Sequence, residues 1–415
     1  MKTKTVSLRQ CLELIIDRRG VTPKKLKSTW KADGYKVLSA NNVKSSRLQN
    51  TNQIRFVDAD TYHKWMKTEI EKNDILLTSE APAGEALLWD SDEKIVVGQR
   101  LYALRVRNTV NPWYLTYYLQ SNRGQKEIQN KCSGSTVFGI SEKMFDYIDV
   151  VLPDKTEQDK IASCIATLEF KIDNNKKIIN QLELLAKTIY DYWFVQFDFP
   201  DKNGRPYKSS GGKMVWNERL QREIPDGRET DILSSLAYFV TKKQDVGILN
   251  ENNYISNDNL INDMGGIKPS QYLPNVISAT EFITRDILLG NIRPYFRKMW
   301  LSDREGGCSA DVLVIRAKNQ ILSEYLYYAL GNKSFFDYDM AGSKGSKMPR
   351  GDKTHIMNFL ICYREDLAIK FSEIVKPFIT QISYLRRENQ QLASLRDFLL
   401  PLLMNGQVSF KSDSI

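Results

Sequence analysis

The sequence is poor in the residues that most enzymes use for metal binding and nucleophilic catalysis. Only two histidines are present, His63 and His355, and they lie in unrelated contexts. Histidine-based metal sites and Ser-His-Asp arrangements are therefore nearly excluded, because both need a histidine beside its partner residues. No GxxxxGK[ST] loop for phosphate binding occurs, and no GxGxxG motif opens a predicted helix.

Paired cysteines and long apolar runs are also absent. The cysteines are odd in number, far apart and without a CxxC pair: Cys11, Cys132, Cys164, Cys308 and Cys362. The first residues, MKTKTVSLRQ, contain no apolar segment of a signal peptide, and no stretch approaches about eighteen uninterrupted apolar residues. We therefore expect a protein of the reducing cytoplasm.

Length and charge indicate a protein of several units with an acidic partner. The chain has 415 residues, of which 42% are hydrophobic and 26% are charged, so two or three folded units are expected. Its formal net charge is +9, and Lys and Arg are spread along the chain instead of forming a tail. A nucleic acid is a plausible partner, although charge alone does not decide the question.

The chain resembles itself at an offset of roughly 210 residues, as a duplicated unit would. NDILLTSEAP at 73–82 returns as RDILLGNIRP at 285–294. Three further pairs follow in the same order: LYALRVRN at 101–108 with VLVIRAKN at 312–319, YLTYYLQSN at 114–122 with YLYYALGNK at 325–333, and CSGST at 132–136 with MAGSK at 340–344. Four matches in one order favour duplication over chance.

Each copy ends in a long helical segment with apolar residues in alternating steps of four and three. The first seam runs through Ile161, Ile165, Leu168, Ile172, Asn175, Ile179, Leu182, Ala186, Ile189 and Trp193. The second runs through Phe371, Val375, Phe378, Ile382, Leu385, Asn389 and Leu392, and Pro377 is expected to end a short helix and start the main one. An amphipathic helix on a globular core explains one such seam, but two matching seams predict an intramolecular coiled coil.

The asparagines of the two seams predict the direction of the helices. In a parallel pair in register, Asn175 and Asn389 would each be buried against an apolar residue, at a cost of about 1–3 kcal/mol apiece. In an antiparallel pair Asn175 lies opposite Asn389, and the next layer pairs Ile179 with Leu385. Two facing amides can satisfy each other and fix the register, so we expect antiparallel helices.

These features divide the chain into five parts. We expect a first domain at 1–153, a long helix at 154–196, a linker at 197–227, a second domain at 228–361 and a C-terminal helical region with a tail at 362–415. The linker is rich in Pro, Gly, Ser and charge and has no periodicity. The domains alternate short β-like runs with polar loops, so the fold class is α+β: two pseudo-repeated mixed α/β domains joined by two long antiparallel helices.

This plan resembles that of the specificity subunits of type I restriction-modification enzymes. The stretch from TEQDK to IPDG at 156–227 is similar to the central region of that family nearly throughout, and LRDFLLPLLMNGQVSF at 395–410 looks like its closing motif. One departure is Arg228, because the family usually has Trp soon after the IPxG of the linker. That difference concerns how the second domain begins.

The resemblance implies a non-catalytic DNA-binding protein. Each globular part would be a target recognition domain that reads one half of a split site in double-stranded DNA, and the helices would set the separation. Two methyltransferase subunits would bind along the helices, and restriction (motor-nuclease) subunits would join them for cleavage. S-adenosylmethionine, ATP and magnesium would belong to those partners, so no cofactor is expected in this chain.

Two other classes of function remain as alternatives. An enzyme that methylates or cuts DNA could use NPWY at 111–114 or Asp154 with EQDK, but a helix start at Pro112 and a helix cap by Asp154 or Thr156 explain these residues better. A purely structural coiled-coil scaffold explains the seams. It does not explain basic loops at equivalent points of two domains.

The residues expected to touch DNA are those whose side chains can read base edges or bind phosphate. In the first domain they are Thr22, Lys24, Lys25, Lys27, Asn41, Asn42, Lys44, Ser79, Glu80, Ser133, Gly134, Ser135 and Thr136. In the second domain they are Asn291, Arg293, Tyr295, Arg297, Lys298, Gly342, Ser343, Lys344, Ser346, Lys347 and Arg350. The loop 342–353 is the strongest candidate, because its cations and three glycines suit a surface loop and not a core. A solvated surface position is the alternative for each single residue.

Overall fold

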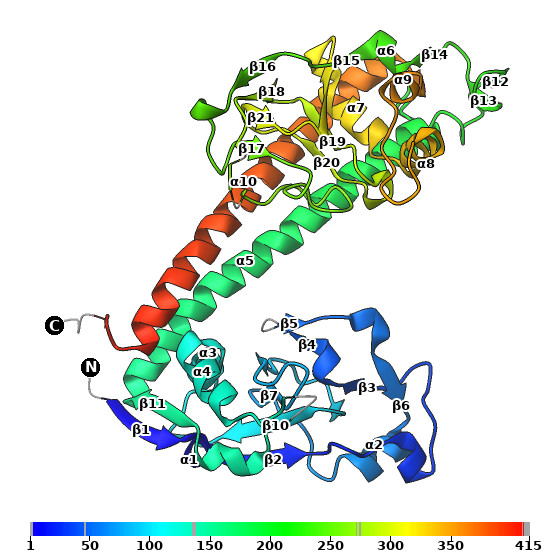
Figure 1. The fold of residues 1–415 in the computed structure, drawn as a ribbon. Coiled ribbons are helices and arrows are strands. Elements are labelled where there is room, and N and C mark those ends of the chain that lie inside the picture. Colours follow the sequence, from blue (N-terminus) through cyan, green and yellow to red (C-terminus); the bar gives the residue numbers. More distant parts are fainter. Residues whose placement is uncertain are drawn as a thin grey trace. The chain divides into compact units, whose positions relative to one another are not determined.

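The computed structural model describes residues 3–44, 47–134, 138–270, 272–273, 275–408 and 410. The chain divides into two compact units (Figure 1). The first consists of Met1–Asn174 with Glu388–Ile415, and the second of Asn175–Arg387. Each unit therefore contains one globular domain and part of each long helix.

In the described part of the first unit, two sheets have more than two strands. The first sheet has the order β2 (Leu12–Asp17), β10 (Leu101–Val106), β7 (Ile75–Thr78) and β8 (Ala86–Leu88), with all neighbours antiparallel. The second has the order β6 (Arg55–Val57), β3 (Tyr35–Leu38) and β9 (Ile95–Val97), in which β3 and β9 are parallel. The remaining elements are β1 (Thr3–Ser7) paired with β11 (Asp149–Pro153), the hairpin β4 (Val43–Lys44) and β5 (Arg47–Leu48), and the helices α1 (Leu8–Cys11), α2 (Ala59–Trp65), α3 (Pro112–Gln120) and α4 (Asn122–Lys131).

The second unit repeats the first sheet. Its order is β15 (Ala237–Phe239), β22 (Val312–Ala317), β19 (Ile287–Gly290) and β20 (Met299–Leu301), again antiparallel throughout. A further sheet has the order β16 (Lys243–Asp245), β18 (Ser278–Phe282), β21 (Gly306–Cys308) and β17 (Tyr254–Ile255). Around them lie β14 (Glu229–Ile232) paired with β23 (Leu360–Tyr363), and the helices α6 (Leu233–Leu236), α7 (Ser323–Leu330), α8 (Lys333–Gly342) and α9 (Lys353–Met357).

Equivalent ion pairs support the duplication at the level of single atoms. In the first unit Arg105 Nη2 lies 2.9 Å from Asp74 Oδ2, and in the second Arg316 Nη2 lies 2.7 Å from Asp286 Oδ2. Both carboxylate side chains are only 1% exposed. Because a buried carboxylate without a partner costs several kcal/mol, the same arginine partner in both copies stabilises the two equivalent sites. The matching order of strands in the equivalent four-stranded sheets of the two units also supports the duplication predicted from the DILL segments.

The two long helices are antiparallel in each unit. In the first unit the beginning of α5 (Lys155–Tyr190) packs on the end of α10 (Glu365–Met404), since Ile161 and Ile165 share a core with Leu403 and Met404. In the second unit Ile179 packs with Ile382 and Leu385, and the ring centroids of Tyr190 and Phe371 lie 5.8 Å apart. Low residue numbers in one helix therefore meet high numbers in the other, and the predicted antiparallel direction is confirmed. The pairing of Asn175 with Asn389 stays a prediction.

The expectation at Pro377 was wrong, because α10 continues through it without a break. Pro377 is exposed, as is Glu373, whose carbonyl loses the helical hydrogen bond that proline cannot donate. Water can satisfy that carbonyl at the surface. On the opposite face Phe371 and Val375 before the proline are fully buried, and Ile382 after it is 5% exposed, so packing holds the helix on both sides of the proline.

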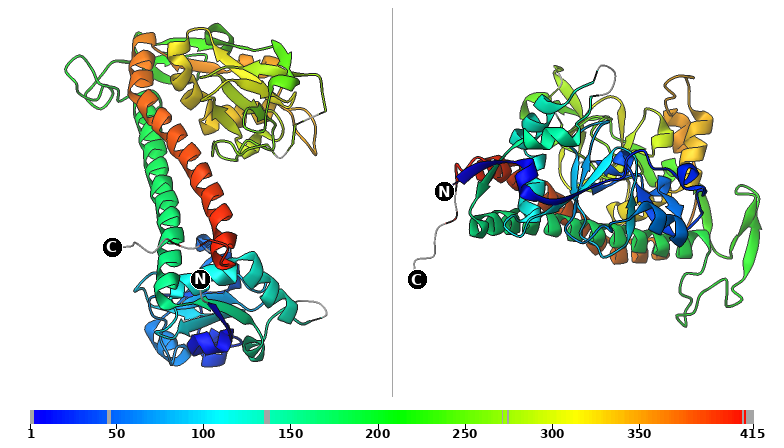
Figure 2. Two further views of the ribbon diagram at one scale, coloured as in Figure 1. Left: turned by 90° about the vertical axis from the view of Figure 1, so that its left-hand side faces the viewer. Right: turned by 90° about the horizontal axis from the view of Figure 1, so that it is seen from below.

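The linker is also more ordered than its composition predicts. Strands β12 (Met214–Asn217) and β13 (Arg222–Pro225) form an antiparallel hairpin, drawn in green, that stands apart from the sheets of its unit (Figure 2). Asn217 Oδ1 accepts a hydrogen bond from the Leu220 amide at 2.9 Å, which closes the turn. Turn chemistry inside the polar run therefore produces a hairpin where we expected an irregular linker.

Arg228 follows this hairpin and is 8% exposed. Its guanidinium carbon lies 4.6–5.3 Å from the ring centroids of Phe194, Phe197 and Phe199, and Nη2 donates to the Trp193 carbonyl at 3.2 Å. Burial lowers the pKa of this guanidinium. The second domain thus begins with an arginine among aromatic rings, where the resembling family usually has tryptophan.

Candidate nucleic-acid interface

In the second domain, two segments predicted to touch DNA lie side by side. Ile292, directly after β19, forms a β-bridge with Arg350, and the Arg293 amide donates to the Pro349 carbonyl at 2.8 Å. Within the loop, the amides and carbonyls of Lys344 and Arg350 exchange two hydrogen bonds of 2.9 and 3.0 Å. The end of a buried strand therefore supports the base of the glycine-rich loop, and the residues at the loop's tip extend beyond that base.

The cations of this loop differ in their partners. Lys344 Nζ lies 2.6 Å from Asp352 Oδ2, and this pairing raises the pKa of Lys344 and holds the pKa of Asp352 at about 2. Arg350 Nη2 lies 3.0 Å from Asp311 Oδ1. Lys347 is exposed, and within the described part of the chain no ion pair is recorded for it. A phosphate can bind Lys347 directly, whereas at the other two positions it must compete with a carboxylate.

The remaining loop positions are on the surface, with Ser346 exposed and Gly342 and Ser343 half-buried. The Ser343 hydroxyl donates to the Asp339 carbonyl at 2.8 Å and so ties the loop to the end of α8. In the neighbouring segment, Tyr295 is 51% exposed, while Asn291 and Arg293 are half-buried. Exposed and half-exposed groups from both segments therefore occupy one face of the domain.

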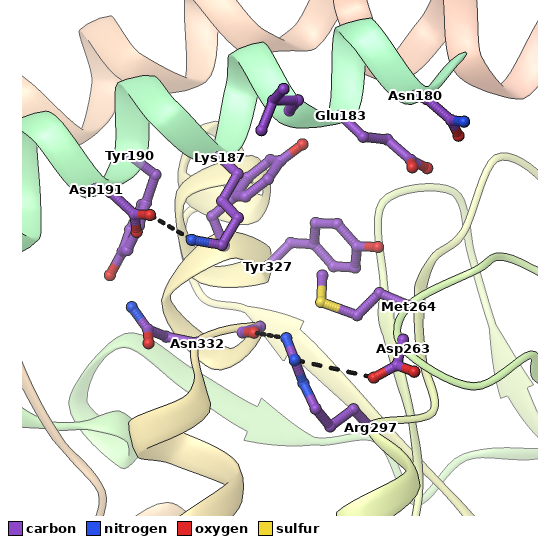
Figure 3. A pocket seen from close by; sticks show the side chains of 13 residues that line it. Asn180, Glu183, Lys187, Tyr190, Asp191, Asp263, Met264, Arg297, Tyr327 and Asn332 are labelled. Carbon is purple, nitrogen blue, oxygen red and sulfur yellow. Dashed lines mark hydrogen bonds and ion pairs between the residues drawn. The ribbon is translucent and has the colours of Figure 1, made fainter. Parts of the chain in front are cut away.

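Arg297 and Lys298 are engaged in contacts with their own domain. Arg297 Nη2 donates to the Gly331 carbonyl at 2.9 Å, and Nη1 lies 3.9 Å from Asp263 Oδ1 (Figure 3). Lys298 Nζ donates to the Asn257 carbonyl at 2.7 Å, and burial lowers the pKa of this ammonium group. These hydrogen bonds stabilise the fold. From the sequence alone, a cation with such a structural role cannot be distinguished from one that contacts DNA.

Arg297 also lines a cavity of about 370 Å³ beside α5 (Figure 3). Glu183 and Lys187 of α5, with Asp191 directly after it, form one wall, and Tyr327 lies on another. Lys187 and Asp191 form an ion pair one turn apart on the helix. The charged groups drawn in Figure 3 thus largely satisfy one another, and we assign no ligand to this cavity.

A buried carboxylate beneath the loop was missed by the sequence analysis. The side chain of Asp339 in α8 is inaccessible to solvent, and neither of its oxygens has a hydrogen-bond partner within the described residues. A Cβ added to Gly351 would lie 2.4 Å from Asp339 Oδ1 and 2.9 Å from Asn291 Oδ1, so only glycine fits between these oxygens. Burial raises the pKa of Asp339 to about 6. Asp339 follows Phe335 and Phe336 at helical spacing on the buried face of α8. This spacing was the sequence signal from which its burial could have been predicted.

The first domain has the same arrangement at its own strand end. Gly139 forms bridges with both Glu80 and Ser133, and the Ile140 amide donates to the Ser79 carbonyl at 2.7 Å. Gly134 has a positive φ of 134°, which favours glycine. Ser79 itself is 1% exposed and its hydroxyl is buried without a hydrogen-bond partner among the described residues, so this side chain lies inside the domain. The predicted contacts Ser135 and Thr136 lie outside the described residues.

The lysine cluster predicted in the first domain lies on a short 3₁₀ helix, η1 (Pro23–Leu26), and on Lys27 directly after it. Thr22 caps it by accepting a hydrogen bond from the Lys25 amide, while Lys24, Lys25 and Lys27 are all exposed. Lys25 Nζ donates to the Gly20 carbonyl at 2.6 Å. Three cations therefore face solvent on one turn and remain accessible to phosphate.

Of the neighbouring asparagines, only Asn41 is exposed. Asn42 is 3% exposed, and its Oδ1 accepts a hydrogen bond from the Ser39 amide at 3.0 Å. Lys44 is half-buried in β4. The Asn42 side chain therefore stabilises its own loop, because its amide accepts the local hydrogen bond that closes the 3₁₀ turn.

The two motifs considered for catalysis are helix starts. Asn111 Oδ1 accepts from the Tyr114 amide at 3.1 Å and caps α3, with Pro112 in the first turn. Asp154 Oδ1 accepts from the Glu157 amide at 2.9 Å and caps α5. In the described ranges, no group of three or more His, Cys, Asp or Glu side chains could hold a metal ion. None of the helices described there has the length and apolar character needed to cross a bilayer.

Fold and surface together define a protein of two duplicated mixed α/β domains, each ending in one arm of an antiparallel helix pair. Residues 2–184 match the type I restriction modification DNA specificity domain. The whole chain is similar in fold to the S subunit of a type I restriction-modification system from M. genitalium, with a TM-score of 0.63, 14% identity and coverage of 97% of this chain and 96% of that one.

Similar sequences have the same designation. The chain is 23% identical over 351 residues to the type I restriction enzyme MjaIX specificity subunit of Methanocaldococcus jannaschii, covering 81% of this chain and 78% of that protein. It is 30% identical over 177 residues to the HindI specificity subunit of Haemophilus influenzae, covering 41% and 38%. The resemblance found in the sequence is confirmed, because the matched domain and both of these relatives are those of type I restriction specificity subunits.

Proposed function

We propose that this chain is the non-catalytic DNA-recognition subunit of a cytoplasmic type I restriction-modification enzyme. Each domain reads one half of a bipartite site, and the long helices set the spacing and dock two methyltransferase subunits. Restriction subunits join that complex for cleavage. The reactions that use S-adenosylmethionine, ATP and magnesium take place in those partners.

One observation carries the proposal: the same loop support occurs twice. In each domain, the segment after the DILL strand holds a glycine-containing loop through isolated β-bridges, at Glu80 and Gly139 in one and at Ile292 and Arg350 in the other. Two equivalent surfaces suit a ligand that offers two equivalent half-sites, as duplex DNA does. Glycine lets the backbone approach a phosphate closely, and exposed lysines neutralise it.

The second-domain loop also contains a candidate for base reading. Arg350 is half-exposed and is held by Asp311 at 3.0 Å. A guanidinium that is oriented in this way can donate two hydrogen bonds to O6 and N7 of a guanine in the major groove. The exposed Lys347 of the same loop supplies charge without base preference.

The test is duplex binding by this chain assembled with its methyltransferase subunits. We expect sequence-dependent affinity that falls with salt, and methyl transfer only when the partner is present. Arg350→Ala should cost roughly 1–3 kcal/mol and relax one half-site. Lys333→Ala is the matched control, since Lys333 is an exposed cation of the same domain on α8 and outside the loop. Methyl transfer by this chain alone, or binding without sequence preference, would contradict the proposal.

A further inference from the structure

The first domain contains a second feature that the loops do not explain. A cavity of about 310 Å³ lies beside strands β3 and β6, which are labelled in Figure 1. Its lining includes the buried residues Val37 and Trp65, which are 8% and 3% exposed, and the exposed residues Asn41, Gln53 and Arg55. This volume is at the lower end of the range for small-molecule sites, about 300–1,000 Å³, so it suits one compact ligand.

Aromatic rings form part of its walls. The ring centroids of Trp30 and Trp65 lie 6.3 Å apart with an interplanar angle of 50°, and the guanidinium carbon of Arg55 lies 4.0 Å from the Trp30 ring centroid. Trp30 is nevertheless 37% exposed. A large indole left partly in water beside a cavity is available to stack on a planar ligand.

The polar groups of the cavity have a consistent chemistry. Asn41 Nδ2 donates to Gln53 Oε1 at 3.0 Å, so two amide side chains lie together on the lining. The indole Nε1 of Trp65 is buried and has no hydrogen-bond partner in the described part of the chain. Among the described lining residues none is acidic, and Arg55 is the cation. Such a set donates and accepts hydrogen bonds without demanding a charged ligand.

We propose that this cavity binds a single nucleobase that has left the base stack. The indoles and the Arg55 guanidinium offer flat faces for stacking, and the amides with Trp65 Nε1 match the donor and acceptor edge of a base. Lys24 and Lys25 of η1 and the adjoining Lys27 are exposed, follow the lining residue Thr22, and are placed to hold the flanking phosphates. The inference rests on the proposed DNA-binding function and adds extrahelical base capture by the first domain.

The experiment measures duplex affinity for the complex of this chain with its methyltransferase subunits. The partner of each base in the recognised sequence is replaced, one position at a time, by an abasic site. A base without a partner costs less to flip, so affinity should rise about tenfold at the position whose base enters the cavity. Trp30→Ala should abolish that gain, and Trp30→Phe, which keeps a stacking ring, should restore most of it. Trp216→Ala is the matched control, because Trp216 is a 56% exposed tryptophan of the other unit.

The outcomes separate this inference from the proposed function. If the wild-type complex does not recognise duplex DNA, the proposed function fails. If it recognises DNA but no abasic position raises the affinity in a way that depends on Trp30, the cavity does not capture a base from DNA. A rise in affinity that is the same in Trp30→Ala would be due to the methyltransferase subunits and would not support the inference. Titration of the four deoxynucleoside monophosphates then decides the source: quenching of tryptophan fluorescence that is lost in Trp30→Ala identifies a free nucleotide as ligand, and unchanged fluorescence rejects the nucleobase site.

Discussion

Replacing the buried Asp339 by asparagine should stabilise the protein at neutral pH. The side chain has no exposed surface, and neither oxygen has a hydrogen-bond partner within the described residues, so ionisation costs free energy in the folded state. Burial raises the pKa of Asp339 from 3.8 to about 6, and His355 opposes that rise only in part. Because the folded pKa is raised, stability falls as pH increases from about 4 to 6 and is then constant. An asparagine has nearly the same shape and cannot ionise.

The size of the effect follows from the two pKa values of Asp339. A rise of about two units corresponds to at most about 3 kcal/mol above pH 7, and to about half of that at pH 5. We therefore expect Asp339→Asn to gain about 1–3 kcal/mol in urea unfolding at pH 7.5 and clearly less at pH 5. Asp337→Asn is the control, since that side chain lies on the same helix and is 62% exposed. A variant no more stable than wild type at pH 7.5, or a gain that is equal at both pH values, would refute the reasoning.

Three other predictions address the loop, the core and the helices. Lys347→Ala should reduce the magnitude of the slope of log affinity against log salt by about 0.9, because one counterion fewer is released on binding. Binding titrations between about 50 and 200 mM salt measure this slope, and an unchanged slope would contradict the prediction. Arg316→Met should cost about 3–5 kcal/mol in urea unfolding, because it leaves Asp286 buried and unpaired. A loss below about 1 kcal/mol would argue against that role. Asn175→Leu and Asn389→Leu should each destabilise, and a double-mutant cycle should show a coupling above about 0.5 kcal/mol, whereas additive effects would exclude their pairing.

The features that the sequence predicted correctly are those written as repeats. The DILL segments recur because each copy needs the same buried central strand, β7 or β19, with all four residues buried in each. The 3-4 spacing predicted both long helices, and the staggered asparagines predicted their direction. Periodicity and duplication can be recognised by comparing the sequence with itself, without knowing which distant residues are in contact in the fold.

The errors and omissions arise where tertiary contacts decide. Pro377 breaks no helix because buried neighbours hold both sides, and Asn42 turns inward because its own loop uses the amide. The aromatic cavity of the first domain joins Trp30 and Trp65, which are far apart in sequence, and no motif links them. The DNA contact of Arg297 stays a prediction, and its hydrogen bond to the Gly331 carbonyl could not be predicted from the sequence.

Exchanging one domain decides whether the two domains read two separate half-sites. Residues 228–361 are replaced by the matching part of a relative that recognises a different site, and the methylated sequences of the host genome are determined for both versions. We expect one half of the methylated sequence to change, while the other half and the spacing stay the same. A change in both halves, or a new spacing with the helices untouched, would contradict this expectation.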